Sequence, residues 1–396
     1  MPRFSFIMMV VFSLLAACDK SGDDAWDYEI EGTRAASIDQ TTLFAVTSDH
    51  VVALNVASGE ELWKTSLPGG LREAPGFQED LVFVGTDEGI LWVLDSDDGT
   101  PLAKAILDGP IGSKPVFEHQ TLLVSTFGGS VYAFDPQDRD ALKKAIDALP
   151  EATTPEEAPD AREPDAGEDP KEDGPKEEQE VESKEEDIPL NLDVPELEPR
   201  WRARTSGPIV APITSHLDDI LIASTDGRAY ALSMADGTRT WTWEGSRQLR
   251  NSVVFADGFF FVASDDGNLH ALTPKGTVQW SAPTLGAINS SPLVWNGLVI
   301  VSNSIGRVTA FDSKSGIEKW QFQVPAGIRH EPVLVADRLA LVDLNGQLHL
   351  LKPAEGKLDT SRALADFGPL ISTEDGLVIL GRTSVFKRTL SAWNEP

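Results

Sequence analysis

The chain has 396 residues, of which 33 are Lys or Arg and 63 are Asp or Glu, so its formal net charge is −30. This length suffices for one large domain or two ordinary ones with a sizeable core. So large an excess of acid argues against nucleic acid as a ligand, because a protein neutralises phosphates with a basic face.

Residues 1–17 have the features of a bacterial export signal. Arg3 supplies the positive start, and the apolar run that follows is interrupted only by two serines. This run is too short to span a bilayer comfortably. It ends in Leu15-Ala16-Ala17-Cys18, and a polar linker, 18–25, begins there.

The sequence around Cys18 resembles the lipobox of bacterial lipoproteins, in which the Cys becomes the new N-terminus and carries the lipid. We therefore expect a protein that is lipid-anchored in the cell envelope and faces the periplasm. By the rule for enteric bacteria, Asp19 favours the inner over the outer membrane, but the rule does not hold in all groups and the choice stays open. The alternative is an ordinary signal peptide or a short anchor. Cys18 is the single cysteine of the chain, so no intramolecular disulfide is expected.

From residue 26 onward, the chain repeats itself about every forty residues. Each copy has a run of four apolar residues, a turn such as Asp226-Gly227, a second strand, a second Gly turn and a Trp. Eight strand-pair units lie between Leu43 and Leu380. The last-strand position is held by Trp63, Ala103, Trp201, Trp241, Trp280, Trp320 and Ser361, and Trp26 is an eighth candidate with Trp393 as its competitor.

These elements predict an all-β fold. Asp-Gly and Asn-Gly supply the positive φ angles of tight hairpins, and runs of Val, Ile and Phe suit strands covered on both faces. A four-stranded antiparallel sheet of forty residues cannot bury both faces alone, so it must stack on copies of itself. Closing the stack into a ring gives a β-propeller. We predict eight blades, with seven as the alternative.

Tryptophans are expected to lie between the blades. Each can bury roughly 150–250 Å² of surface. The residues predicted to have this role are Trp63, Trp201, Trp241, Trp280 and Trp320.

An acidic insert, 136–199, divides the propeller into a first part, 26–135, and a second part, 200–396. Within it, residues 151–190 hold 17 acidic and four basic residues, six Pro and no aromatic residue. Such a stretch buries too little apolar surface to offset its ordering entropy, so we predict disorder, with a short helix over 141–149. Its role is either a tether for a basic partner or a cation, or a solubilising loop.

No residue pattern predicts a catalytic, cofactor or metal site. The turns Asp95-Ser96-Asp97-Asp98-Gly99 and Asp265-Asp266-Gly267 contain carboxylates that suit Ca²⁺, but they lie where the repeat needs Asp and Gly for turn geometry. His270 and His349 share one repeat position, and the other histidines lack ligand spacing. We therefore expect no enzyme activity.

The repeat resembles the quinoprotein-type, pyrroloquinoline quinone-like β-propeller repeat. The resemblance rests on Val131-Tyr132-Ala133-Phe134-Asp135 and on the segment from Thr309 through Gly316 to Trp320. With the lipobox, the chain is similar to the BamB family of outer-membrane assembly lipoproteins, from which the acidic insert and Asp19 depart.

The resemblance implies a non-catalytic scaffold that binds envelope proteins, with the β-barrel assembly machinery as the partner that it suggests, and that is attached to the membrane by its lipid. Two alternatives stay open: a pyrroloquinoline quinone-dependent dehydrogenase, whose usual vicinal cysteine pair is missing here, and a ligand-sensing propeller.

Overall fold

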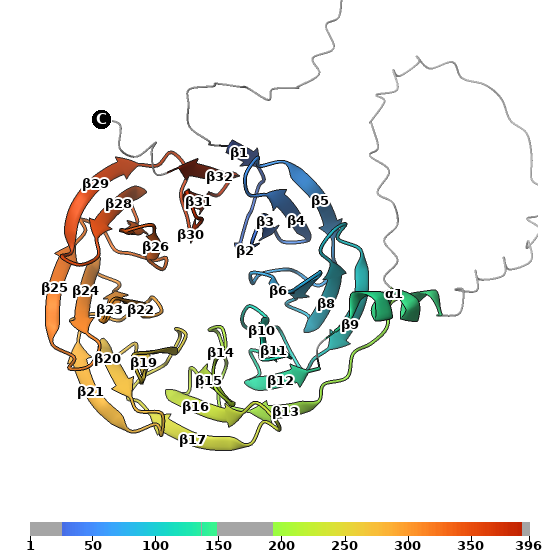
Figure 1. The fold of residues 1–396 in the computed structure, drawn as a ribbon, viewed down its shortest axis with the longest axis horizontal. Helices are drawn as coiled ribbons and strands as arrows, with labels where there is room; N and C mark the ends of the chain where they lie inside the picture. The colour runs from blue at the N-terminus through green and yellow to red at the C-terminus, as the bar shows by residue number, and fades with distance from the viewer. Residues whose placement is uncertain (1–25, 136, 149–192, 390–396) are drawn as a thin grey trace, which may run out of the picture.

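The computed structural model describes residues 26–135, 137–148 and 193–389. Within them, eight four-stranded antiparallel sheets stand side by side in a ring, each with its first strand nearest the centre (Figure 1). Blades 1 to 7 are β2–β5, β6–β9, β10–β13, β14–β17, β18–β21, β22–β25 and β26–β29, and blade 8 is β30–β32 with β1. The predicted eight-bladed propeller is confirmed, and the seven-bladed alternative is wrong.

The strands follow the repeat closely. In the first half of the ring they are β1 (Trp26–Glu29), β2 (Ala35–Asp39), β3 (Thr42–Val46), β4 (His50–Asn55), β5 (Glu61–Ser66), β6 (Gly76–Gln78), β7 (Leu81–Gly85), β8 (Ile90–Asp95), β9 (Pro101–Ile106), β10 (Val116–Glu118), β11 (Thr121–Ser125), β12 (Ser130–Phe134), β13 (Trp201–Arg204), β14 (Thr214–His216), β15 (Asp219–Ala223), β16 (Arg228–Ser233) and β17 (Arg239–Glu244). In the second half they are β18 (Val254–Ala256), β19 (Phe259–Ala263), β20 (Asn268–Leu272), β21 (Val278–Pro283), β22 (Leu293–Trp295), β23 (Leu298–Ser302), β24 (Arg307–Asp312), β25 (Glu318–Gln323), β26 (Val333–Val335), β27 (Arg338–Val342), β28 (Gln347–Lys352), β29 (Lys357–Ala363), β30 (Leu370–Ser372), β31 (Gly376–Leu380) and β32 (Ser384–Thr389).

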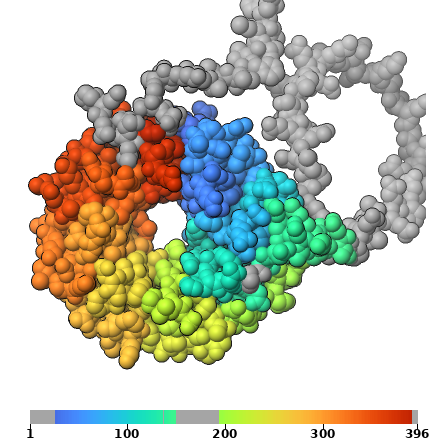
Figure 2. All heavy atoms as spheres, in the orientation of Figure 1, coloured from blue at the N-terminus to red at the C-terminus, as the bar shows by residue number. Residues whose placement is uncertain are grey.

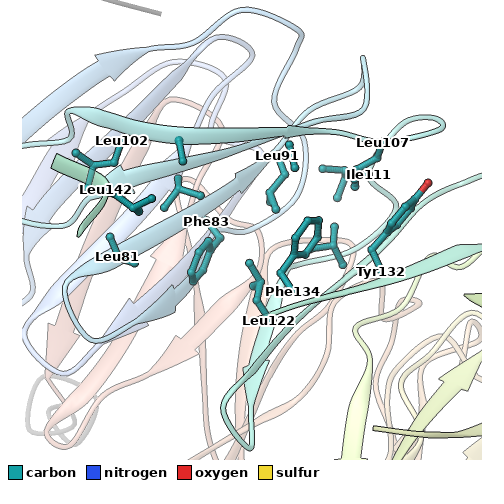
Figure 3. Packing of buried hydrophobic residues seen from close by; sticks show 14 residues of the cluster. Leu81, Phe83, Leu91, Leu102, Leu107, Ile111, Leu122, Tyr132, Phe134 and Leu142 are labelled. Atoms are coloured by element: carbon teal, nitrogen blue, oxygen red, sulfur yellow. The ribbon is translucent and has the colours of Figure 1, made fainter. Parts of the chain in front are cut away.

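The core lies between neighbouring blades. The second and third strands are buried on both faces, as the runs of four apolar residues predict; all five residues of β7 and of β11 are buried. Phe83 of blade 2 and Phe134 of blade 3 share one cluster, which Figure 3 shows with Leu142 beside it. Each fully buried side chain of this kind contributes about 1.5–3 kcal/mol.

Both ends of the described chain meet in blade 8. Strand β1 pairs antiparallel with β32, with Trp26 opposite Lys387 and Glu29 opposite Ser384. Trp26 therefore fills the last-strand position of this blade, and its competitor Trp393 lies outside the described residues. Figure 2 shows that the ring encloses an open central channel.

Both ends of the insert 136–199 are ordered, whereas the stretch 151–190, for which disorder is predicted, lies outside the described residues. Helix α1 (Arg139–Asp147) overlaps the expected helix, and its Leu142 is buried. At the other end, Glu196 forms a parallel bridge with Lys104 of β9. Apolar contacts with blade 2 order these two segments, whereas residues 149–192 lie outside the described residues. No helix in the described parts of the chain is long and apolar enough to cross a bilayer.

Candidate functional site: the blade junctions and the turn face

The predicted tryptophans lie on the outermost strands and reach across to the following blade. The indole N–H donates to a backbone carbonyl in the next blade's outer turn, the turn between its third and fourth strands. These hydrogen bonds, 2.8–3.0 Å long, join Trp26 to Val56, Trp63 to Ser96, Trp201 to Met234, Trp280 to Ser313 and Trp320 to Pro353. The indole also covers a turn glycine: a Cβ on Gly316 would lie 2.6 Å from Trp280.

Trp241 makes the same ring contact but lacks the hydrogen bond. A Cβ on Gly276 would lie 2.6 Å from its ring, yet its buried Nε1 has no acceptor among the described residues. The outer turn of blade 5 is one residue short, because the Gly276 N–H donates to the carbonyl of Thr273, whereas the Gly316 N–H donates to that of Asp312. This shortened turn also explains why Trp241 and Trp280 are 39 residues apart instead of 40.

Two blades have no tryptophan in the last strand. One holds Ala103, as expected, but the other position is Thr360, because Thr360 lies opposite Leu350 just as Trp320 lies opposite Ala310. Ser361 instead pairs with His349, so its assignment to this place is wrong. The glycine-to-tryptophan spacing is four positions, which leads from Gly356 to residue 360.

The missing tryptophans coincide with missing outer turns. After blade 2, the outer turn of blade 3 is replaced by the insert; after blade 7, that of blade 8 is replaced by the two chain ends. Leu142 of α1 joins Leu102 and Ala103 in one cluster, so the helix covers the alanine that stands in the tryptophan place. Arg139 and Lys143 hold the helix there through the buried Asp95, with Nζ of Lys143 2.5 Å from Oδ2 of Asp95.

The turn face is the side of the ring that carries the turns between second and third strands and the loops between blades. A cavity of about 770 Å³ opens on it across blades 4 and 5. It is lined by residues 225–227, 244–248, Asp265 and 287–289. These segments belong to two blade turns and two interblade loops, so only the closed ring brings them together.

The cavity wall is polar and already organised. Arg250 Nε donates to Asp265 Oδ2 at 3.0 Å, and Asp226 accepts the backbone N–H of Arg228 at 2.9 Å. Asn289 Nδ2 donates to the carbonyl of Ile328 in the next interblade loop. Small-molecule pockets are mostly apolar and enclosed, whereas this open polar hollow is suited to the side chains of a protein partner.

Charged side chains also lie at the loops that enter the inner strands. Burial raises the pKa of Glu73 to about 7, even though the neighbouring Arg72 opposes the shift. Burial lowers the pKa of Lys114, whose Nζ lies 4.9 Å from the centre of the Phe77 ring, while Asp39 opposes that shift. These groups precede β6 and β10, the strands that Figure 1 shows nearest the centre of the ring.

The histidines of the repeat lie in hydrogen-bonded chains. Nε2 of His349 is 3.2 Å from Asp343 Oδ2, and its Nδ1 is 3.2 Å from Ser361 Oγ. This order of residue types is found in hydrolase triads, but His270 and Ser281 form the same pair in blade 5. Asp343 also accepts backbone N–H groups of its own turn. The Asp–His–Ser hydrogen bonds are therefore a structural feature of the repeat.

The Asp-rich turns use their carboxylates internally. Asp95 binds α1, and Asp266 accepts the backbone N–H of Asn268 at 2.9 Å. No group of three His, Cys, Asp or Glu side chains that could hold a metal occurs in the described residues. Cys18 lies outside them.

The sequence reasoning missed the cavity, because no local motif marks it. Its lining residues come from interblade loops that differ in sequence, such as 244–248 and 287–289. Aligning the repeat copies would have shown that these loops lie on one face, although not that they leave a hollow.

A family model and several curated relatives point to the same family. A family model described as outer membrane protein assembly factor BamB matches residues 12–138, 76–154 and 225–370. The BamB of Burkholderia pseudomallei is 31% identical over 115 residues, which cover 28% of this chain and 30% of that protein. The BamB of Escherichia coli is 26% identical over 213 residues, or 48% of this chain and 52% of that protein. The chain thus spans about half or less of the length of these relatives.

A solved structure gives the same architecture. The crystal structure of BamB from Moraxella catarrhalis superposes with a TM-score of 0.68 at 15% identity, covering 92% of this chain and 98% of that one. At this identity, the likeness supports the fold alone.

Proposed function

Because the chain belongs to the BamB family of outer membrane protein assembly factors, we propose that it is a non-catalytic scaffold that binds other proteins of the cell envelope during outer membrane protein assembly. The observation that carries this proposal is the cavity on the turn face. It is polar, open and built from hydrogen-bonded loops and turns of neighbouring blades, which suits a protein-binding site.

The partner that we propose is a component of the β-barrel assembly machinery. The cavity presents the carboxylates of Asp226 and Asp265 next to the Arg250 guanidinium and the amide of Asn289. Groups of both signs at fixed positions set the register and orientation of a protein contact more than its bulk affinity.

We further propose that the scaffold is held at the membrane by a lipid on Cys18 and faces the periplasm. Supporting this are the Leu-Ala-Ala-Cys sequence and the apolar run before it. Replacing Cys18 with Ser should release the protein into the soluble fraction after cell breakage. Fractionation should also show which membrane holds the wild type, and Asp19→Ser tests whether Asp19 sets that choice.

Photo-crosslinking from native membranes tests the partner. A benzoyl-phenylalanine placed at Gln248, on the cavity wall, should crosslink to a barrel-assembly protein identified by mass spectrometry. The matched control is Lys275, which is exposed in the outer turn of blade 5 on the opposite side of the ring. Equal crosslinking from both positions, or none from Gln248, would count against the proposal.

A further inference from the structure

Exposed apolar side chains are concentrated in one sector of the ring. Of the nine large hydrophobic residues that are exposed in the described chain, six lie between β20 and β29. Three are on the turn face: Leu285, Ile305 and Leu344, with exposed fractions of 68, 53 and 51%. The other three, Val278, Ile317 and Leu358, lie at the outer turns on the opposite side.

The three turn-face residues lie at two successive blade junctions, and together they are called the apolar ridge. Leu285 lies in the loop between blades 5 and 6, and a Cβ on the adjacent Gly286 would lie 3.4 Å from Cγ1 of Ile305. In the same way, a Cβ on Gly327, in the next interblade loop, would lie 3.1 Å from Cδ1 of Leu344. Loop and turn therefore touch at both junctions, and the ridge runs over blades 6 and 7.

Leu285 is exposed in an unfavourable backbone conformation. Its φ is +61°, and every other described non-glycine residue with positive φ lies in a turn between first and second strands. A left-handed conformation costs an L-residue about 1–2 kcal/mol. The corresponding loop positions hold Pro68, Asp108 and Ser206. Neither burial nor backbone geometry favours a leucine here, and such outliers point to a binding role.

The turn face changes from acidic to apolar along the ring. Where blade 6 has Ile305 and blade 7 has Leu344, the turns of blades 4 and 5 have Asp226, Asp265 and Asp266. Although burial raises the pKa of Asp266, hydrogen bonds from Ser246 and Asn268 hold it below the usual value, so this carboxylate is charged at neutral pH. A ligand that covers both halves needs apolar side chains at one end and basic ones at the other.

We propose that the apolar ridge docks an extended protein segment, with its apolar residues over blades 6 and 7 and its basic residues at Asp266 of blade 5, because the neighbouring Asp265 is already paired with Arg250. This inference rests on the proposed scaffold function and specifies the chemistry of the partner. The ridge lies beside the cavity, because Leu285 precedes the wall residues 287–289 by two positions, so one partner can contact both.

The test is direct binding of a synthetic peptide to the purified protein. The probe is a fluorescein-labelled peptide with alternating Leu and Ile at one end and a run of Lys at the other, followed by anisotropy. The ridge variant is Ile305→Ser with Leu344→Ser. The matched control is Ile317→Ser with Leu358→Ser, which makes the same changes on exposed residues of the same blades on the opposite side.

The ridge variant should raise the Kd about tenfold, equivalent to about 1.4 kcal/mol, and the control should change it less than about twofold. Replacing the Leu and Ile of the peptide with Ser, or its Lys with Glu, should weaken binding to the wild type. Circular dichroism and thermal melting check that both variants fold.

Equal Kd values for the two variants would overturn the proposal, and so would a peptide that binds equally well without its apolar end. Sedimentation at high protein concentration could also contradict the proposal. If the wild type forms a dimer and the ridge variant does not, the ridge is an interface between copies of this chain. If the peptide does not bind but Gln248 still crosslinks to a barrel-assembly protein, the ridge proposal is wrong and the proposed function stands. If the peptide binds but that crosslink is lost, the proposed assembly role is wrong and the ridge proposal stands.

Discussion

Each tryptophan at a blade junction combines ring burial with one hydrogen bond, and the shortened turn of blade 5 separates the two. Trp280 has both, whereas the Nε1 of Trp241 is buried without an acceptor. Replacing a buried donor by an apolar group costs about 1 kcal/mol when its partner is left unsatisfied, and much less when the donor had no partner.

We therefore expect Trp280→Phe to reduce the free energy of unfolding by about 1 kcal/mol more than Trp241→Phe. Both substitutions remove a similar ring volume, so the difference isolates the hydrogen bond. Urea unfolding followed by circular dichroism measures it. Equal losses would mean that the carbonyl of Ser313 contributes nothing to this junction.

Glu73 should make stability depend on pH. Its folded-state pKa is about 7, above the ordinary value of 4.5, so the fold favours the neutral carboxyl. The associated stability is fully present below pH 4.5 and is lost as the pH rises to about 7. Glu73→Gln should therefore stabilise the protein by about 3 kcal/mol at pH 8 and have little effect at pH 4. Glu88→Gln, at an exposed position of the same blade, is the control, and thermal melts across this pH range would reveal a flat difference if the idea is wrong.

At the scale of the element, tryptophan and outer turn form one unit shared by two blades. Six blades have the tryptophan, and each is followed by a blade whose outer turn has a glycine beneath the ring. The two blades without it precede the insert and the chain ends. A tryptophan without a following outer turn has no glycine to cover and no carbonyl to bind. This explains why Ala103 and Thr360 occupy the tryptophan position in these two blades.

A matched pair of glycines tests this unit. Gly316 and Gly297 have similar φ values, +70° and +77°, but a Cβ meets Trp280 at Gly316 and open space at Gly297. The backbone strain of an alanine is therefore shared, and Gly316→Ala should cost about 1–3 kcal/mol more through the clash. In a Trp280→Ala background, the two substitutions should cost the same. A difference that persists there would place the clash elsewhere.

The sequence predicts these elements well because turn and strand signals are local. Asp226-Gly227 and Asp266-Gly267 do form tight turns with glycine φ near +85°, and the runs of apolar residues are buried as expected. The sequence predicts the helix at the start of the insert but not the contacts that hold the two ends of the insert, because the partners are distant in the sequence: Glu196 bridges Lys104, and Arg139 reaches Asp95. Composition gives only the mean polarity of such a segment. Local propensity cannot show which neighbouring blade it contacts.

The cavity and the apolar ridge exist only at the scale of the whole ring. Their residues are contributed by successive blades, and the angle between blades sets their separation. The repeat places Leu285 and Ile305 on one face, but only the closed structure shows that their segments touch. The proposed binding surface therefore depends on ring closure, which one blade made from both ends of the described chain provides.

Closure depends on the junction around Trp26. Its indole donates to the carbonyl of Val56 and covers Gly59 of blade 1, while Arg388 of β32 binds Asp27 at 3.0 Å. Trp26→Ala should therefore cost about 3–5 kcal/mol, as for a buried tryptophan in a core, although the residue lies at the first position of the described chain. Frayed ends normally contribute little.

Hydrogen exchange should become faster in blades 1 and 8 first, because opening there breaks the ring. As a control, Tyr28→Phe removes only an exposed hydroxyl contact with Glu61 and should leave hydrogen exchange unchanged. If Trp26→Ala lowers the free energy of unfolding by less than about 1 kcal/mol, the ring closes without this junction.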